Sequence, residues 1–543
     1  MLISLRREGL IMKVKPVHLM TAAGLAAGLL AVNGGCGGSN SSPIVQKSYN
    51  VLFVVTDQEH FFANYPQGTN YRARQLLAEM GTTFEKHYVC SNMSTSSRST
   101  IFTGRHVAHT GMIDNTDFPW QGAMSDTLRT IGDIMNDAGY YSALKGKWHL
   151  GKSTILGNDP TLTSLDHYGF RDWGGTDYIG SVWQGHEKDP VIVSEAREWL
   201  GTKGRQINSQ GKPFFLMLTM INPHDIMDYD ITGYESPTLH LGGKPDSGVY
   251  ATTYDYPLPS SWNFNVNAEN LPGGIKLYNH NWSILAGKIT SPDIWKDYQD
   301  YYFNCIQDSD NNLMSVIDSL RENNMLSNTI IIFTADHGEM HGSHSLKGKG
   351  GFIYENNIHV PMIIVHPDFE GGRKVSAVTS HIDIAATLSD IAGMSEDLPG
   401  KSLMPLMRGE NSVREGSLFC YEMLSMSAPC VVSGDGITYD FTEMGRGMLR
   451  GITAEGYKFA RWFSPLDFNT PTTIEELYAH NDVQLFDTVN DPEELNNLAD
   501  DPETNRDIIM RINELLNSQI ASEIGNDDGE HVRKILDAIR SSR

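Results

Sequence analysis

Short runs of apolar and β-branched residues recur along the chain without polar interruption. They occupy residues 50–56, 213–219, 329–334 and 361–365. Continuous runs of this length are typical of strands that are buried on both faces of a parallel sheet. We therefore expect these segments to form strands of one buried sheet.

Between these runs, apolar residues return at helical spacing. Segments 72–80, 127–138 and 382–392 each stop at a glycine, which is the residue most common just past a helix end. A longer amphipathic pattern covers residues 297–323. Strands that alternate with helices predict an α/β fold, with a large, mixed but mostly parallel sheet flanked by helices.

The pattern changes near Gly416. Short strands such as 456–460 follow, and the chain closes with an amphipathic helix over 507–520 and a charged tail. This change predicts two domains, a large one over residues 48–415 and a smaller α+β domain over residues 416–543.

The N-terminal segment follows the pattern of a bacterial export signal. Basic residues precede an apolar run over 19–32, which is shorter than the about 20 residues that a membrane-spanning helix needs. Small residues precede Cys36, and a polar tether over 37–47 follows it. We expect a lipoprotein-type signal peptide over residues 1–36 of an exported bacterial protein. The product would be anchored to the outer membrane through Cys36, or cleaved nearby and soluble in the periplasm.

Composition limits the classes of partner. Of 543 residues, 42 are basic and 66 are acidic, which gives a formal net charge of −24. Nucleic-acid binding needs a basic surface, so this charge argues against it. An anion would have to bind in a local basic pocket, because the chain as a whole repels it. The only membrane contact that we expect is the N-terminal lipid anchor.

The five cysteines show no disulfide framework. Their number is odd, and no pair has the spacing of a zinc site or a redox motif. Cys420 and Cys430 could pair if two strands brought them together. Otherwise, the cysteines are small buried hydrophobic residues.

Polar residues with metal-binding chemistry follow two of the expected strands directly. Asp57 and Gln58 follow the first strand, and Asp336 and His337 follow a later one. Sites in open α/β sheets form where the strands end, so the two pairs could meet at one edge. Two carboxylates, an amide oxygen and an imidazole suit a divalent metal ion. Alternatively, each aspartate only caps a helix or a turn.

A hydroxyl-rich segment begins another expected helix. Residues 90–105 carry several serines and threonines, and Gly104 closes the helix. A helix N-terminus favours an anion, and Arg98 and Arg105 supply fixed charge for a tetrahedral oxyanion. Taken alone, the segment could equally be a capped helix with solvated arginines.

This segment is the first of five motifs along the chain. It includes Ser94, Ser97, Arg98, Ile101 and the run 103–105. The others lie at 139–151, 222–225, 334–361 and 485–498. In order and spacing, the motifs resemble the sulfatase family of the alkaline-phosphatase superfamily, over roughly residues 48–505. The resemblance implies an alkaline-phosphatase-like fold and places Ser94 at the nucleophile position.

The resemblance also implies an activity. The chain would be a sulfuric-ester hydrolase that removes sulfate from a small substrate, which we expect to be a sulfated carbohydrate. A sulfatase-maturating enzyme would first oxidise Ser94 to formylglycine, whose hydrated form attacks sulfur in this family.

The family motifs further imply a role for each matching residue. One divalent metal ion, Ca2+ or alternatively Mn2+, would be held by Asp57, Gln58, Asp336 and His337. The remaining site residues would be Arg98 and Lys147 at the nucleophile and sulfuryl group, His149 as the base, and His224 and Lys349 at the sulfate and its bridging oxygen.

Two departures from the family pattern keep other interpretations open. Ser96 stands where the family has Pro or Ala, in the stretch that the maturation enzyme reads. Gln58 stands where a second Asp is usual, and relatives that resemble phosphonate monoester and phosphodiester hydrolases share this Asp-Gln pair. The chain could therefore be such a hydrolase, or a catalytically inactive surface glycan-binding protein. The longest insert, 228–279, carries aromatic residues that would stack on a sugar or only anchor the loop.

Overall fold

The computed structural model describes residues 48–154, 157–158, 162–230, 233, 236, 241–433 and 436–541. The expected signal peptide, Cys36 and the tether lie outside these residues. Among the residues described, no helix combines the length and the apolar character needed to cross a membrane. Residues 48–543 form one compact unit, and the boundary between residues 415 and 416 stays a prediction.

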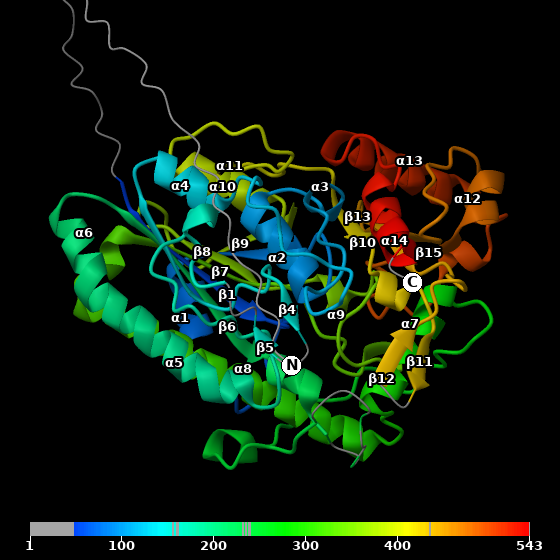
Figure 1. The fold of residues 1–543 in the computed structure, drawn as a ribbon, viewed down its shortest axis with the longest axis horizontal. Helices are drawn as coiled ribbons and strands as arrows, with labels where there is room; N and C mark the ends of the chain where they lie inside the picture. The colour runs from blue at the N-terminus through cyan, green and yellow to red at the C-terminus, as the bar shows by residue number, and fades with distance from the viewer. Residues whose placement is uncertain are drawn as a thin grey trace, which may run out of the picture. The chain divides into compact units, whose positions relative to one another are not determined.

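A mixed sheet of seven strands forms the centre of the fold, in the order β3-β6-β1-β7-β8-β2-β9. The strands are β1 (Asn50–Asp57), β2 (Thr82–Tyr88), β3 (Tyr141–Gly146), β6 (Phe214–Pro223), β7 (Thr329–Ala335), β8 (Met362–Val365) and β9 (Arg373–Ser380). Strand β8 runs antiparallel to both of its neighbours, and the other pairs are parallel. The expected mixed, mostly parallel sheet is confirmed (Figure 1).

Strand β1 shows that each face of the sheet packs against its own hydrophobic core. Val51, Phe53 and Val55 belong to one hydrophobic core, and Leu52 and Val54 belong to another. Helices α2, α4, α10 and α11 cover the first face, and α1, α5 and α8 cover the second (Figure 1). These helices are α1 (Arg72–Met80), α2 (Ser94–Thr103), α4 (Ile131–Asp137), α5 (Gln184–Trp199), α8 (Pro292–Glu322), α10 (Asp383–Ile391) and α11 (Met404–Met407). At the centre of the sheet both faces exclude water, so β1, β6, β7 and β8 read as continuous apolar runs, whereas β2 and β9 at one edge keep polar, partly exposed positions.

Further helices and strands of this region lie outside these layers. They are α3 (Val107–Thr110), α6 (Arg205–Ser209), α7 (Gly273–Ala286), α9 (Glu355–Ile358), β4 (Ser153–Thr154) and β5 (Gly157–Asn158). The four described cysteines, Cys90, Cys305, Cys420 and Cys430, are buried and free. Cys420 and Cys430 are therefore not paired, and the interpretation as buried hydrophobic residues holds for these four.

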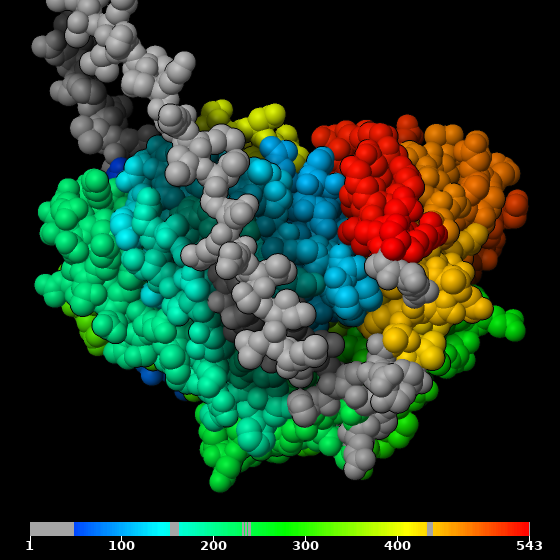
Figure 2. All heavy atoms as spheres, in the orientation of Figure 1, coloured from blue at the N-terminus to red at the C-terminus, as the bar shows by residue number. Residues whose placement is uncertain are grey.

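A four-stranded antiparallel sheet forms the smaller C-terminal region, in the order β10-β13-β14-β15. Its elements are β10 (Gly416–Tyr421), β13 (Met448–Ala454), β14 (Tyr457–Phe463), β15 (Asp482–Asp487), the hairpin of β11 (Cys430–Ser433) and β12 (Gly436–Tyr439), and the helices α12 (Ile474–His480), α13 (Arg506–Glu523) and α14 (Glu530–Ser541). Figure 2 shows the last helices, in red, directly beside the segment near residue 110. There, Ile113 shares a hydrophobic core with Val532 and Leu536.

The start of two helices and the structure of the C-terminal tail differ from what the sequence patterns predict. The helix expected from residue 127 begins at Ile131, because Thr130 forms a capping box with Asp133. The long helix begins five residues earlier than expected, at Pro292, where Ser291 caps its N-terminus. The expected charged tail contains α14, because Val532 and Leu536 of this helix pack in a hydrophobic core.

Candidate active site

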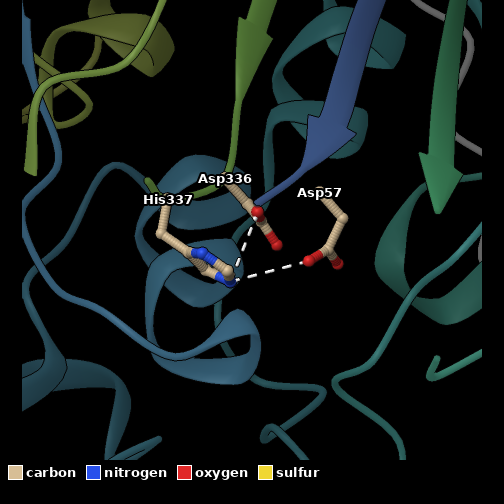
Figure 3. A group of neighbouring side chains, drawn as sticks. All are labelled: Asp57, Asp336 and His337. Carbon is tan, nitrogen blue, oxygen red and sulfur yellow. Dashed lines mark ion pairs between the residues drawn. The ribbon is translucent and has the colours of Figure 1, made fainter. Parts of the chain in front are cut away.

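The ends of β1 and β7 bring the two expected metal-binding pairs together. His337 Nε2 lies 3.6 Å from Asp57 Oδ1 and 3.4 Å from Asp336 Oδ1 (Figure 3). Strands β1 and β7 are adjacent and parallel, so their carboxyl ends open onto the same edge of the sheet. The three side chains are buried, and each offers one ligand atom within 4.8 Å of the others.

Gln58 makes contacts of its own. Its side-chain oxygen accepts a hydrogen bond from Lys349 Nζ at 2.7 Å, and its Nε2 donates to Glu339 Oε2 at 2.6 Å. Its backbone N–H donates to Asp336 Oδ1 at 3.0 Å. Gln58 therefore links the lysine, the glutamate and Asp336, and its role as a metal ligand stays a prediction.

Helix α2 presents its first residue to this cluster. Ser94 Oγ lies 3.1 Å from His337 Nε2 and 3.4 Å from Asp57 Oδ2. One helical turn later, Arg98 donates to Asp57 Oδ2 and to Asp336 Oδ2, each at 3.0 Å. The spacing of four residues thus places the hydroxyl and the guanidinium on the same carboxylate.

Other polar side chains near α2 have different partners. Thr95 Oγ1 donates to the His149 carbonyl at 2.9 Å, and Ser96 Oγ donates to the Ile113 carbonyl at 3.3 Å. Arg105 donates to a backbone carbonyl, that of Asp397, at 3.1 Å. Of the two arginines expected to supply charge for an anion, only Arg98 contacts the buried carboxylates.

Two lysines complete the positive side of the cluster. Lys147 Nζ lies 2.6 Å from Asp57 Oδ2. Lys349 Nζ lies 3.8 Å from Asp57 Oδ1 and 3.5 Å from Ser94 Oγ. With Arg98, these lysines place three cationic side chains around two carboxylates. The site therefore gathers three cations around its buried carboxylates, although the chain as a whole carries a net charge of −24.

Two histidines at the cluster have buried ring nitrogens without a partner among the described residues. These atoms are Nδ1 and Nε2 of His149 and Nδ1 of His224. The backbone of His149 is fixed by Asp177, whose carboxylate accepts its N–H at 2.9 Å and that of Trp148 at 2.8 Å. Gly180 lies against the ring of His224, since a Cβ there would sit 2.5 Å from its Cε1. Buried polar atoms are normally paired, so these nitrogens are available to a bound group.

Burial keeps the imidazoles of the site neutral. Burial, and then the charge of Lys147, lower the pKa of His149 well below its ordinary value. Burial, and then the charge of Lys349, do the same to the pKa of His224 and of His337. Each ring therefore has a lone pair at neutral pH, with which it can accept a proton or bind a metal ion.

The two carboxylates hold their charge differently. Burial and the neighbouring Asp57 raise the pKa of Asp336 to about 7. Burial also acts to raise the pKa of Asp57, but the ammonium of Lys147 and other nearby cations hold it well below its usual range. A further cation between the two groups would favour the charged form of both.

Backbone strain gathers at this edge of the sheet. Gln58, Met93 and His149 have φ angles of 70°, 74° and 55°. Non-glycine residues rarely adopt positive φ, and each such conformation costs about 1–3 kcal/mol. Each of these residues belongs to the cluster or directly precedes one of its members. Strain of this kind is typical of functional sites, where the surrounding structure holds a side chain in place.

The donor set fits a divalent metal ion. Asp57, Asp336 and His337 converge from two strand ends, and all three are completely buried. Two carboxylates and one neutral imidazole are ligands that divalent cations accept in proteins. The geometry supports the expectation of a buried metal-binding group at this position. The identity of the ion stays a prediction.

Comparison with known proteins decides the family. The sequence matches the family model described as Sulfatase over residues 49–394. The chain belongs to the sulfatase family. Sulfatases are sulfuric ester hydrolases, and the expected resemblance to this family is confirmed.

Named relatives cover most of this sulfatase. The N-acetylglucosamine-6-O-sulfatase of Bacteroides thetaiotaomicron is 23% identical over 506 residues, which is 83% of each chain. The solved structure of BT4656 in complex with its substrate D-glucosamine-2-N,6-O-disulfate has a TM-score of 0.63 at 19% identity, and covers 89% of this chain and 100% of that chain. A phosphonate monoester hydrolase of Agrobacterium radiobacter has a TM-score of 0.61 at 20% identity, with 88% and 96% covered. At these identities, the structural similarity shows a shared fold.

Three contributors to the sulfatase site were missed by sequence reasoning. Asp177 and Gly180 lie in a loop without periodicity, where only the fold shows that they hold His149 and His224. Glu339 stands three residues after Asp336 in the late motif, which is the one sequence signal that could have found it. It accepts hydrogen bonds from Gln58 and from the Gly348 backbone at 2.6 and 2.7 Å.

A glycine-to-alanine pair tests the contact with His224. Gly180 and Gly175 both have positive φ, so alanine at either position should cost about 1 kcal/mol of unfolding free energy. Only at Gly180 would the added Cβ meet the histidine, since at Gly175 the nearest atom is 3.8 Å away. We expect Gly180→Ala to lower kcat/KM about 100-fold, because small misplacements of site residues have effects of this size. Gly175→Ala should show a smaller thermal shift, from its positive φ alone, with normal activity. Equal activities would mean that the contact with Gly180 does not hold His224 in a position that catalysis needs.

Proposed function

We propose that this sulfatase hydrolyses the sulfate ester of a small sulfated carbohydrate, with Ser94, oxidised to formylglycine, at the point of attack. The observation that carries the proposal is the position of Ser94 Oγ, 3.1 Å from His337 Nε2 and 3.4 Å from Asp57 Oδ2. A nucleophile held there lies beside the metal-binding group and faces Lys349 at 3.5 Å. Preorganised positive charge at the reacting atom is the usual source of catalysis for anionic transition states.

The surrounding side chains would divide the remaining work. Arg98 and Lys147, both paired with Asp57, would hold the nucleophile and the charge on the sulfuryl oxygens. His149, neutral and without a ring partner, would take the proton when sulfate is released.

The leaving oxygen needs a proton or a cation. His224 and Lys349 would contact the sulfate and this bridging oxygen. Burial lowers the pKa of Lys349 to about 8, so the ammonium is retained at neutral pH and can still give up its proton.

Two further components supply what an unmodified serine lacks. Asp57, Asp336 and His337, with Gln58 beside them, would hold one divalent ion, for which Ca2+ is the first candidate and Mn2+ the second. Such an ion supplies Lewis acidity and neutralises charge. The hydrated aldehyde of formylglycine supplies a second hydroxyl, through which the sulfated nucleophile can be released. A sulfatase-maturating enzyme would carry out the oxidation of Ser94.

The substrate class rests on the relatives. One is an N-acetylglucosamine-6-O-sulfatase, and another was solved with D-glucosamine-2-N,6-O-disulfate. We extend this class to the present chain. The N-terminal sequence adds the proposal that the enzyme is exported to the periplasm or anchored to the outer membrane by a lipid on Cys36.

A phosphonate monoester or phosphodiester hydrolase is the second candidate. Gln58 favours it, because relatives that resemble phosphonate monoester and phosphodiester hydrolases share the Asp-Gln pair that this chain has at residues 57 and 58. The fold of the phosphonate monoester hydrolase from Agrobacterium radiobacter is similar. A phosphonate monoester and a phosphodiester carry the same single negative charge as a sulfate monoester, but they have two non-bridging oxygens in place of three, so the contacts of the site should favour one of them clearly.

Parallel kinetics distinguish the two candidates. We expect the matured enzyme to turn over 4-nitrocatechol sulfate and a sulfated glucosamine with a higher kcat/KM than aryl phosphonate monoesters. A panel of sulfated mono- and disaccharides then identifies the preferred ester position. A preference for the phosphonate would establish the second candidate, and no turnover of any ester by protein of verified maturation would favour the glycan-binding alternative.

A further inference from the structure

A cavity lies beside the segment that leads to Lys349. It has a volume of about 260 Å³, and its walls come from α7, the start of α8, the 264–267 loop and the turn over 345–347. Pockets for drug-sized molecules measure roughly 300–1,000 Å³, so this cavity lies just below that range and suits a ligand no larger than about one sugar ring. It belongs partly to the insert 228–279, the longest between the sulfatase motifs.

Aromatic rings form much of the cavity wall. Tyr278 and Trp282, one turn apart on α7, lie with their planes 20° apart and their ring centres at 6.0 Å. Trp295 and Phe264 also line the cavity. Flat aromatic surfaces of this kind pack well against the apolar face of a sugar ring, and leave the ring hydroxyls free for polar partners.

Polar groups lie beside these rings. The indole N–H of Trp282 is buried and has no hydrogen-bond acceptor among the described residues. Asn265, Asn267 and Asn279 add amide groups to the lining. Buried donors are normally satisfied, so the unpaired N–H indicates that a ligand hydroxyl or an anionic oxygen completes the site.

The charge of the cavity is positive. Lys288 and Lys347 both line it, whereas no acidic residue does. Lys347 Nζ donates to the Ala286 carbonyl at 2.5 Å, which holds the ammonium at the wall. In a chain of net charge −24, a cavity lined by lysines alone among charged residues favours an anionic ligand.

The walls are held in place from outside the cavity. Asn281 on α7 donates to the Ala428 carbonyl at 3.0 Å and accepts from the Cys430 N–H at 3.1 Å, which fixes the helix to the C-terminal region. Tyr278 donates to the Lys347 carbonyl at 3.0 Å, which fixes the helix to the turn. A preformed cavity loses little affinity to ordering on binding.

We propose that this cavity binds a sugar unit that carries a sulfate or a carboxylate, in addition to the sugar whose ester reacts at Ser94. The inference rests on the proposed function for its substrate class. Its position fits that role, because residues 345–347 line the cavity, Lys349 follows two residues later, and Trp282 packs close to Gly348 between them. The sugar is either the neighbouring unit of the substrate or part of a separate glycan.

Direct binding tests the site without turnover. Full-length Ser94→Ala protein would be titrated calorimetrically with a disaccharide of one uronate and one sulfated glucosamine. We expect Lys288→Ala, at an exposed position, to weaken binding about fivefold, as expected for one exposed charge pair. Trp282→Phe should weaken it about tenfold, because the ring stays and the N–H is lost. Lys276→Ala, which removes a lysine of α7 outside the lining, is the matched control and should bind normally.

Equal affinities of Lys288→Ala, Trp282→Phe and the control would overturn the proposal. Kinetics of the Ser94 protein then separate the two sources of the sugar. A neighbouring unit of the substrate predicts a fivefold higher KM for the disaccharide in Lys288→Ala, with an unchanged KM for 4-nitrocatechol sulfate. A separate glycan predicts weaker binding with both KM values unchanged. Weakened binding in a protein that turns over no sulfate ester would support the cavity and refute the proposed function.

Discussion

Asp57→Asn and Asp336→Asn are each expected to lower kcat/KM for a sulfate ester by about 1,000-fold or more. Each variant removes one charged donor from the group that includes His337. A metal ion contributes several kcal/mol to a transition state that gains negative charge, and 1,000-fold corresponds to about 4 kcal/mol. Metal content should fall with activity, because the remaining donors bind a divalent ion less tightly.

The choice of asparagine at position 57 follows from its neighbours. Asp57 pairs with Arg98, Lys147 and Lys349, and alanine would leave three buried cations without this partner. Removing one member of a buried ion pair costs about 3–5 kcal/mol, a large share of the about 5–15 kcal/mol of a folded domain. Asparagine keeps the volume and one oxygen acceptor, so the fold should survive.

The measurement combines kcat/KM, metal content by mass spectrometry and far-ultraviolet circular dichroism. Asp487→Ala is the matched control, since Asp487 also ends a strand, β15, but its carboxylate, among the described residues, accepts hydrogen bonds from Val489 and Asn490 of its own turn. It should keep near-normal activity and metal content. Near-normal turnover of Asp57→Asn in the presence of a chelator would show that the metal assignment is wrong.

The local parts of the fold could be predicted from the sequence, because a strand that is buried on both faces needs a short run of consecutive apolar residues. The run at residues 50–56 is apolar at every position, since each face of β1 packs on a separate core. The pairing of Asp57 with Asp336 followed from the same reasoning. Both residues follow buried strands, and the ends of adjacent parallel strands share one edge.

The non-local parts could not be predicted, because they depend on which segments pair. Nothing in residues 361–365 shows that β8 runs against its neighbours. The contact of Asp177 with the His149 backbone joins two loops, and neither loop has a periodicity that could reveal it. Arg105 looked equivalent to Arg98 in sequence, yet only Arg98 lies on the helix face that meets the carboxylates.

The second large effect concerns Ser94 itself. Ser94→Ala is expected to lower kcat/KM by about 10,000-fold or more, the scale at which removing a nucleophile acts. The neighbouring hydroxyl cannot replace it, because Thr95 Oγ1 donates to the His149 carbonyl and accepts from the Thr116 N–H. Thr95→Ala is the control and should retain most of the activity.

Maturation can be followed by mass and by host. Oxidation of serine to formylglycine removes two hydrogens, about 2 Da, from the peptide that carries Ser94. A host that matures serine-type sites should give active protein with this loss, and a host that matures only cysteine-type sites should not. Ser94→Cys should gain activity in the second host, unless Ser96 blocks recognition there.

Ser96→Pro should then raise the maturation of Ser94→Cys. Ser96 is the third residue of α2, where the backbone N–H has no partner within the helix, so proline removes no helical hydrogen bond. The substitution loses only the weak bond from Ser96 Oγ to the Ile113 carbonyl at 3.3 Å. We expect the fraction of protein with formylglycine to rise and the thermal stability to change little. Unchanged maturation would mean that Ser96 does not obstruct the maturation enzyme.

Two outcomes would contradict the assignment of Ser94 in different ways. Full activity of Ser94→Ala would move the nucleophile to a neighbour, with Thr95 the first to test. Full activity of Ser94 protein that shows no mass loss would instead indicate direct attack by the serine hydroxyl. Sulfated serine has no elimination route back to the free enzyme, whereas a phosphorylated serine can be hydrolysed by attack of water at phosphorus. Unmodified, active Ser94 would therefore favour the phosphodiester or phosphonate hydrolase, the reaction that Gln58 already keeps open.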